Sequence, residues 1–222
     1  MAGKLSPKIR IIFLKKFEKI CMLVLIRAYN QVVKDNKYNI DWEEEEFTAH
    51  IFSYMENLSL TRKCKLHINI EHKLLNINKL PINENNPKKL PRIDISFASW
   101  EIIENEKVKY FFEAKNLYEN NYKTKKSSSY INRYIDTGIE NFRTNRYYNG
   151  SLVGYVLKGD VDKIIGKIEK QLKKDRKKYK PYNSLSNFEK KSRIKSFKHY
   201  YETKHLTPLK KEIIIKHIFL KF

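Results

Sequence analysis

Apolar residues recur every three or four positions in the first part of this chain and every second position further on, and this change of period limits the folds open to it. Between Ile9 and Ala28 the spacing is typical of an amphipathic helix. Between Leu66 and Ile70 it indicates a strand. Helices first, then strands, a crossover helix and final strands predict an α/β fold with a central mixed β-sheet flanked by α-helices.

The expected elements follow these two periods to the end of the chain. Helices are expected over residues 8–35, 42–55 and 161–178, and strands over residues 65–76, 93–103, 107–117, 151–157, 197–206 and 212–222. Two hairpins are predicted, one around residues 104–107 and one around Pro208. Asn39 to Asp41 offers an N-cap for the second helix.

The connecting stretches are polar. Pro81 to Pro91 is predicted to be a loop, and residues 180–196 are expected to be irregular. Residues 118–129 are Ser-rich and allow two interpretations. They form either a loop over the sheet or the lead into a helix that spans Tyr130 to Ile139.

The chain is strongly basic, and the charge is concentrated toward its C-terminal end. The net charge is +21 over 222 residues, and residues 158–222 hold 20 basic against 7 acidic side chains. A folded protein normally keeps such a field only when its partner is anionic, so nucleic acid is the expected partner. The alternative is a genomic base bias that also enriches Asn and Ile. The length predicts one domain over residues 1–222, with a core at about 40–160 and the basic part packed on it.

Cysteine usage and hydropathy argue against several other classes of protein. Cys21 and Cys64 are the only cysteines and form no C-x2-C pair, so neither a structural zinc site nor a disulfide framework has support. The apolar run from Ile20 to Ile26 is far shorter than the roughly 20 residues that span a bilayer, and no small-residue cleavage site closes it. We therefore expect a soluble, cytoplasmic protein with no membrane partner.

Asp94, Glu113 and Lys115 are the candidate catalytic residues. Residues two apart on a strand point to the same face, so Glu113 and Lys115 lie side by side while Ala114 faces the other way. With a turn at residues 104–107, Asp94 comes opposite a position within a few residues of Glu113. Two carboxylates can hold Mg²⁺, and a lysine can offset the charge of a phosphodiester transition state.

The acid-x-Lys pattern alone is weak in so Lys-rich a chain. It begins at Asp35, Glu71, Glu113, Asp175, Glu189 and Glu202. Glu113 differs from the others because it follows the core-like run Val108 to Phe112, where burying two charged residues would otherwise be costly. The competing interpretation is a structural ion pair between Glu113 and Lys115, with Asp94 as a turn carboxylate.

The segments PRIDISF and YFFEAKNL, whose Asp and Glu stand 19 positions apart, resemble the second and third strands of the PD-(D/E)xK nuclease superfamily. The resemblance implies a restriction-endonuclease-like fold and Mg²⁺ as cofactor, with Mn²⁺ able to substitute. It gives metal-binding roles to Asp94 and Glu113, and it gives Lys115 the role of positioning or activating water. The chain departs from the family pattern at Pro91, which stands three residues before the Asp instead of directly before it.

Many members of this superfamily carry a further glutamate on the first core helix, and WEEEEFTAHIF resembles that helix. Glu44 is the predicted catalytic and metal-binding residue there because it shares a helix face with Phe47 and Ile51. Glu43 and Glu45 are close alternatives. Equally, all four glutamates from 43 to 46 could simply complement the helix dipole.

The segment that follows resembles the helix and fourth strand of such nucleases. The residues expected to contact nucleic-acid phosphate there are Arg133, Arg143 and Arg146. Tyr147 and Tyr148 either pack on the sheet, which we favour, or stack on a base. His205 and His217 lie on the last predicted hairpin, where they are either structural or close to a bound phosphate.

The predicted function is therefore a Mg²⁺-dependent nuclease that acts on DNA in preference to RNA. By analogy with small members of the superfamily, we expect an endonuclease of restriction or anti-phage defence, acting as a homodimer or as the nuclease subunit of a larger complex. No G-x4-G-K-[ST] motif is present, so any nucleotide-driven step would need another subunit. The alternatives are a catalytically silent nucleic-acid-binding or assembly module on the same fold, and a purely structural subunit.

Overall fold

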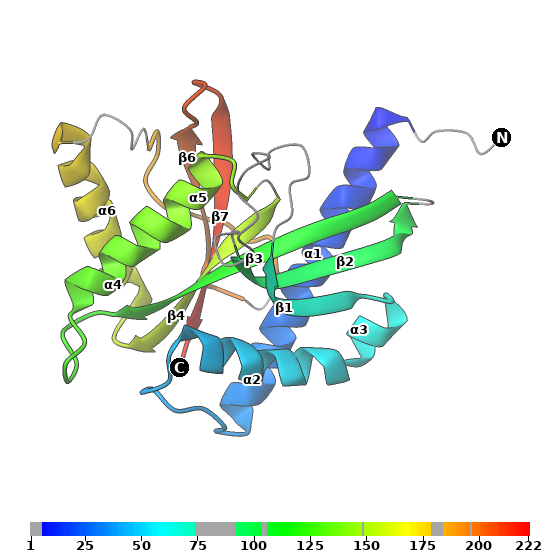
Figure 1. The fold of residues 1–222 in the computed structure, drawn as a ribbon, viewed down its shortest axis with the longest axis horizontal. Helices are drawn as coiled ribbons and strands as arrows, with labels where there is room; N and C mark the ends of the chain where they lie inside the picture. Colours follow the sequence, from blue (N-terminus) through cyan, green and yellow to red (C-terminus); the bar gives the residue numbers. More distant parts are fainter. Residues whose placement is uncertain (1–5, 74–91, 104–105, 148, 179–183, 196) are drawn as a thin grey trace, which may run out of the picture.

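A seven-stranded mixed sheet, in the order β1-β2-β3-β4-β7-β6-β5, lies at the centre of the computed structural model over the residues that it describes (Figure 1). Those residues are 6–73, 92–103, 106–147, 149–178, 184–195 and 197–222. The strands are β1 (His67–Lys73), β2 (Arg92–Ile103), β3 (Glu106–Tyr118), β4 (Gly150–Lys158), β5 (Glu189–Lys190), β6 (Tyr200–Leu206) and β7 (Glu212–Lys221). The predicted α/β class with a central mixed sheet is confirmed.

The sheet combines two antiparallel ends with a parallel centre. β1, β2 and β3 are antiparallel neighbours, β4 runs parallel to β3, and β7 runs parallel to β4. β7 then pairs antiparallel with β6, and β6 with β5. Both predicted hairpins, β2 with β3 and β6 with β7, are present. Because β7 lies between β4 and β6, the basic C-terminal part shares one sheet with the predicted core.

Helices cover both faces of this sheet (Figure 1). The helical elements are α1 (Pro7–Lys34), α2 (Glu44–Asn57), α3 (Ser59–Lys63), α4 (Ser127–Arg133), the π-helical turn η3 (Tyr134–Ile139), α5 (Glu140–Arg143) and α6 (Val161–Lys178). Phe112 of β3 packs with residues of α1 and α2, whereas its neighbour Phe111 packs with residues of α4, η3, α5 and α6. The alternation of side chains along β3 thus divides the core into two layers.

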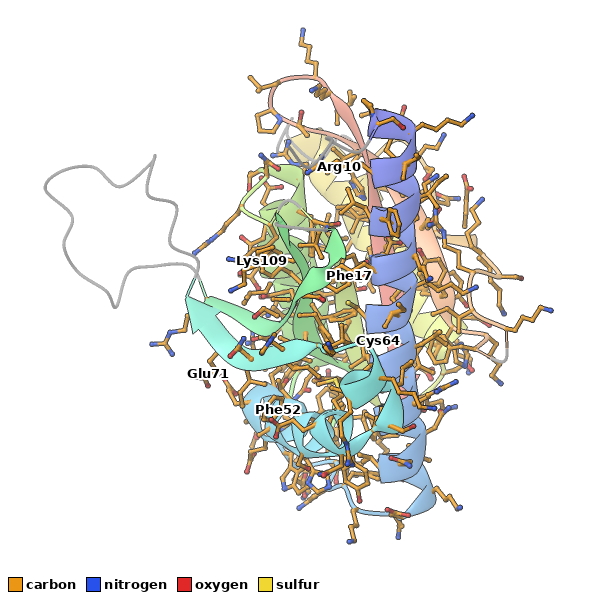
Figure 2. The ribbon with its side chains drawn as sticks, turned by 90° about the vertical axis from the view of Figure 1, so that its right-hand side faces the viewer. Arg10, Phe17, Phe52, Cys64, Glu71 and Lys109 are labelled. Carbon is orange, nitrogen blue, oxygen red and sulfur yellow. The ribbon has the colours of Figure 1, made fainter. Side chains whose placement is uncertain are left out.

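α1 is the longest helix and lies along one face of the sheet (Figure 2). Ser6 caps it by accepting a hydrogen bond from the Ile9 amide, and Pro7 occupies its first turn, where a missing N–H costs nothing. Phe17, on the side of α1 that faces the strands, has no exposed surface. The predicted apolar face is therefore buried from Phe17 onward, whereas Ile9 and Ile12, at the start of that face, are exposed.

The crossover between the parallel strands β3 and β4 contains α4, η3 and α5. Residues 118–129 lead into this helix, which begins at Ser127, and so the second of the two predicted interpretations is the right one. The π-helical turn lies close to β4, since a Cβ added to Gly138 would come within 2.9 Å of the Leu152 side chain. π-helical turns are frequent at functional sites, and this one directly follows Arg133.

Some local boundaries differ from the prediction. The second helix is capped by Glu43 and not by a residue of 39–41, because the Glu46 side chain accepts a hydrogen bond from the Glu43 amide at 2.8 Å. Within the stretch predicted to be irregular, β5 pairs with β6. The predicted loop Pro81 to Pro91 lies outside the described residues. Among the helices that the structure describes, none combines the length and the apolarity needed to cross a membrane.

Candidate active site

The pairing of β2 with β3 brings Asp94 to Glu113. Ile95 is paired with Phe112, so the next position on each strand places Asp94 opposite Glu113. The Ala114 amide donates a hydrogen bond to Asp94 Oδ2 at 2.6 Å, which fixes this carboxylate against β3. The two carboxylates predicted from the sequence therefore lie next to each other.

Lys115 lies among three carboxylates. Its Nζ donates to Glu113 Oε1 at 2.7 Å and to the Ala114 carbonyl oxygen at 2.7 Å. The same Nζ is 3.7 Å from Glu44 Oε2 and 4.0 Å from Asp94 Oδ2. The four predicted catalytic residues thus form one group, which we call the carboxylate–lysine cluster (Glu44, Asp94, Glu113 and Lys115).

Glu44 is the one glutamate of the four at the start of α2 that is buried. Both of its oxygens have protein partners: Oε1 accepts from the Asn116 amide at 3.1 Å, and Oε2 accepts from Arg133 at 2.9 Å. In this arrangement Glu44 connects α2, β3 and α4. Glu43 is instead paired with Lys125 at 3.0 Å, on the exposed side of the helix start.

Burial and mutual repulsion shift the protonation of the cluster. Glu113 is only 5% exposed, and this burial, together with the nearby charge of Asp94, raises its pKa to about 7. Burial also raises the pKa of Asp94, although Lys115 partly opposes it. Burial alone would lower the pKa of Lys115, but the three carboxylates outweigh it and hold that pKa above its usual value. The cluster therefore favours a charged lysine and shifts Glu113 toward its protonated form.

Glu113 also carries an oxygen without a partner. Oε2 is buried and has no hydrogen-bond partner among the described residues. The nearby Tyr147 hydroxyl donates to the Arg92 carbonyl oxygen at 2.6 Å, so its single proton is already engaged. Buried polar atoms are normally satisfied, and an exception calls for an explanation such as a ligand that binds there.

The donor set suits a magnesium ion. Glu113, Asp94 and the Ala114 carbonyl supply oxygen ligands, and Mg²⁺ is commonly held by one or two carboxylates while it keeps several waters. Among the described residues, no group of three His, Cys, Asp or Glu side chains is placed to hold a metal. The fit therefore rests on Asp94 and Glu113, and the metal-binding role of Glu44 stays a prediction.

The three predicted phosphate-contacting arginines have different environments. Arg133 is half exposed beside Glu44 at the edge of the cluster. Arg146, three residues after the end of α5, is exposed and donates a hydrogen bond to Asn141 Oδ1 at 3.4 Å. Arg143 does not fit the prediction, because its side chain is only 5% exposed and it binds both oxygens of Glu140. As placed, Arg143 holds its helix together and cannot reach a phosphate.

His205 of β6 and His217 of β7 lie close together, as their positions on paired strands allow. They lie inside the core and not at the surface. Thr203 Oγ1 is hydrogen-bonded to His205 Nε2 at 2.8 Å and to His217 Nε2 at 2.7 Å, and the Tyr134 hydroxyl is 2.9 Å from His217 Nδ1. We call these four residues the histidine cluster. Both imidazoles have no exposed surface, and burial lowers the pKa of His217 well below its usual range. A phosphate cannot reach them in this arrangement.

Two residues that the sequence reasoning did not assign to the site support it. Asn116 is buried next to Lys115, and its amide and side chain bind Glu44 and the Trp42 carbonyl. An Asn directly after the acid-x-Lys pattern in a core strand is the signal that could have indicated it. Tyr147, predicted to pack on the sheet, does so and also lies close to Glu113, while Tyr148 lies outside the described residues.

The cluster can therefore do three things chemically. It offers oxygen ligands to a divalent cation, it presents a fixed ammonium next to them, and it has a guanidinium at its edge. These are the groups that hydrolysis of a phosphodiester uses. No protein-family model, no curated protein and no solved structure matches this chain.

Proposed function

We propose that the protein is a Mg²⁺-dependent nuclease that hydrolyses phosphodiester bonds of DNA at the carboxylate–lysine cluster. The observation that carries the proposal is Glu113, a buried carboxylate with one unpartnered oxygen that lies between Asp94 and Lys115. Burying such a group without full compensation costs stability, and strongly shifted carboxyl groups concentrate at functional sites.

The residues of the cluster would divide the work between them. Asp94 and Glu113 would hold the metal, with the Ala114 carbonyl oxygen beside them. When bound, Mg²⁺ supplies electrostatic stabilisation of the phosphate and lowers the pKa of water. Lys115 would donate to a non-bridging phosphate oxygen and offset its growing negative charge. Arg133, held by Glu44, would bind a phosphate next to the one that is cleaved.

Topology and charge support this assignment independently of the cluster. An antiparallel β2–β3 hairpin that carries the acidic residues, followed by a helical crossover to a parallel fourth strand, is the arrangement expected for a restriction-endonuclease-like core. The lysines of α6 add positive charge, and Lys163, Lys170, Lys173 and Lys174 are all exposed. Such a surface favours binding to a polyanionic backbone.

Incubation with several nucleic acids tests the proposal. Purified protein is mixed with supercoiled plasmid, single-stranded DNA and RNA in Mg²⁺, Mn²⁺ or EDTA, alongside Asp94→Ala and Lys115→Ala. We expect nicking of the plasmid in Mg²⁺ and Mn²⁺, no cleavage in EDTA, and loss in both variants. A matched control is Lys16→Ala, which removes an exposed lysine of α1 and should leave the rate within about twofold. Cleavage that survives Lys115→Ala would refute the assignment of the site.

A second candidate is a binding module that does not cleave. It is favoured by the position of the Lys115 ammonium, which pairs with Glu113 Oε1 and donates to the Ala114 carbonyl oxygen, both at 2.7 Å. This candidate predicts equal, salt-dependent binding of nucleic acid by the wild type and the Lys115→Ala variant, with no product in any metal. The nuclease proposal predicts product in the wild type alone.

A further inference from the structure

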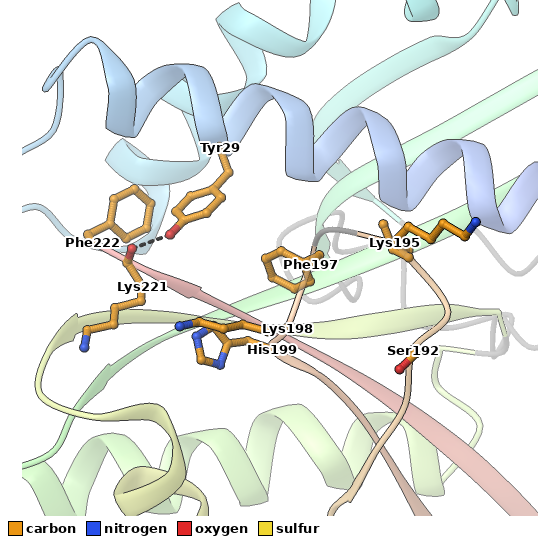
Figure 3. A pocket seen from close by; sticks show the side chains of 9 residues that line it. Tyr29, Ser192, Lys195, Phe197, Lys198, His199, Lys221 and Phe222 are labelled. Carbon is orange, nitrogen blue, oxygen red and sulfur yellow. Dashed lines mark hydrogen bonds between the residues drawn. The ribbon is translucent and has the colours of Figure 1, made fainter.

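A pocket lies away from the carboxylate–lysine cluster, between α1, the end of β7 and residues 192–195 and 197–199 (Figure 3). Its volume is about 700 Å³, which is in the range of small-molecule sites. None of the four cluster residues lines it. The pocket therefore belongs to a different part of the molecule and calls for its own explanation.

Aromatic rings form one side of this pocket. Tyr29 of α1 meets Phe222 edge to face, with ring centroids 5.3 Å apart, and Phe197 lies further along (Figure 3). The Tyr29 hydroxyl donates to the Lys221 carbonyl oxygen, which ties the helix to the end of β7. A rigid aromatic surface of this kind suits a flat ring system such as a nucleobase.

The other side of the pocket is cationic. Lys195, Lys198 and Lys221 line it, and no acidic residue does in the part of the chain that the structure describes. Figure 3 shows Lys198 and Lys221 extending toward one end while Lys195 extends toward the other. His199 lies between them, and its buried Nδ1 has no hydrogen-bond partner among the residues described. The pocket therefore offers the positive charge of Lys198 and Lys221 to an anion at one end of the aromatic surface.

We propose that this pocket binds a nucleoside phosphate. The base would stack on Phe197 and Phe222, and the phosphate would lie between Lys198 and Lys221, with His199 as an additional polar partner. Charge complementarity selects an anion, and the aromatic surface selects one that carries a flat ring. The occupant is either a free nucleotide or the phosphorylated end of a nucleic-acid strand, which share this chemistry.

Equilibrium binding in EDTA tests the pocket without any contribution from metal-dependent cleavage. The probes are AMP, ATP, adenosine, inorganic phosphate and a short 5′-phosphorylated oligonucleotide, each titrated into the wild-type protein by calorimetry. AMP is expected to bind at least about tenfold more tightly than phosphate, because one stacked base contributes that much or more, and more tightly than adenosine, because adenosine lacks the phosphate that the lysines bind. Failure of the nuclease assay leaves this measurement unaffected.

Matched pairs of variants decide where binding occurs. Lys198→Gln with Lys221→Gln changes two exposed pocket lysines, and Lys170→Gln with Lys174→Gln removes the same charge from α6. We expect the pocket pair to weaken AMP about tenfold or more and the α6 pair to change it less than about twofold. Phe197→Leu, whose folding is checked by circular dichroism, should bring the affinity for AMP close to that for phosphate.

These measurements distinguish a free nucleotide from the phosphorylated end of a strand, and they can also overturn the proposal. Tight binding of AMP or ATP identifies a free nucleotide, whereas binding of the oligonucleotide alone, with the same loss in the pocket pair, identifies a strand end. Equal affinity for phosphate and AMP, or equal losses in the two lysine pairs, would overturn the proposal, because either result would reduce the pocket to nonspecific attraction.

Discussion

Two polar clusters lie beneath the helices of this protein, and they differ in their charge and in their exposure to solvent. In the carboxylate–lysine cluster Glu113 keeps an unpartnered oxygen, and Asp94 has 27% of its side chain exposed. In the histidine cluster Thr203 joins His205 to His217, and both imidazoles are completely buried. One cluster is charged and open to solvent at one side, whereas the other is neutral and closed.

This difference separates a candidate functional site from a structural network. The histidine cluster is buried, so a ligand cannot reach it in this arrangement, and its hydrogen bonds specify the packing of the strands around it. A buried carboxylate that is incompletely paired is destabilising on its own, and a bound cation would relieve it. The comparison assigns chemistry to the first cluster and structure to the second, and the predictions below test that division.

Removal of Lys115 should have the largest effect on stability. Lys115→Met leaves buried carboxylates without their cation, so we expect a loss of about 3 to 5 kcal/mol in the free energy of unfolding at pH 8 in EDTA. Adding Mg²⁺ should restore part of the loss, because the divalent ion takes over the charge of the ammonium. Denaturant unfolding with and without Mg²⁺ measures both, with Lys170→Met as the control for an exposed lysine.

The two clusters should respond to pH in opposite directions. The pKa of Glu113 is raised to about 7 from an ordinary 4.5, so the folded state binds more protons over this interval and stability falls as pH rises through it, by about 3 kcal/mol. The pKa of His217 is lowered, so its contribution is present above pH 6.5 and is lost as the pH falls below that value.

Variants separate the contributions of Glu113 and His217 to the pH dependence of stability. Glu113→Gln should flatten the fall in stability between pH 4.5 and 7, and His217→Gln should flatten the loss on acidification. Unfolding free energies measured in EDTA from pH 4.5 to 8 check both. Identical slopes in the wild type and Glu113→Gln would show that the carboxyl group of Glu113 titrates normally.

Thr203→Val tests the claim that the histidine cluster is structural. The variant keeps the shape of the side chain but removes the hydroxyl that serves both imidazoles, so we expect a loss of about 2 kcal/mol. Cleavage per folded molecule should be unchanged. Thermal unfolding and the plasmid assay are compared on the same sample, and a selective loss of cleavage would place this network in the chemistry.

The smallest expected effect distinguishes two arginines. Arg133→Gln, at the edge of the carboxylate–lysine cluster, should weaken nucleic-acid binding by about 1 kcal/mol and leave folding intact. Arg143→Gln should do the reverse, because it breaks a buried bidentate pair with Glu140. Fluorescence anisotropy at two salt concentrations, together with thermal unfolding, assigns each effect.

Local sequence patterns predicted the parts of the site that depend on local geometry. The period of two placed Glu113 beside Lys115, and the hairpin brought Asp94 opposite them. The helical period identified Glu44 as the inward glutamate, since it shares a face with the buried Phe47. These placements follow from side-chain direction, which depends only on neighbours in the chain or across one hairpin.

Long-range features could not be predicted in the same way. The insertion of β7 between β4 and β6 depends on pairing between segments about 60 residues apart, which no local period encodes. The burial of Arg143 depends on how α5 lies against β6, where the Leu206 carbonyl oxygen accepts from it. Asn39 and Asp41 are of residue types better suited to an N-cap than Glu43 is. Glu43 nevertheless caps the helix, because α2 starts where Glu44 meets β3.

The most direct test is the rate of Mg²⁺-dependent plasmid nicking by Glu113→Gln and His217→Gln relative to the wild type at pH 8, with concentrations corrected for the folded fraction. Glu113→Gln removes a proposed metal ligand and a buried charge, so cleavage should fall by about 100-fold or more while stability is maintained or rises. His217→Gln should lose stability but cleave within about threefold of the wild type. A Glu113→Gln protein that nicks plasmid at the wild-type rate would contradict the assignment of the carboxylate–lysine cluster as the active site.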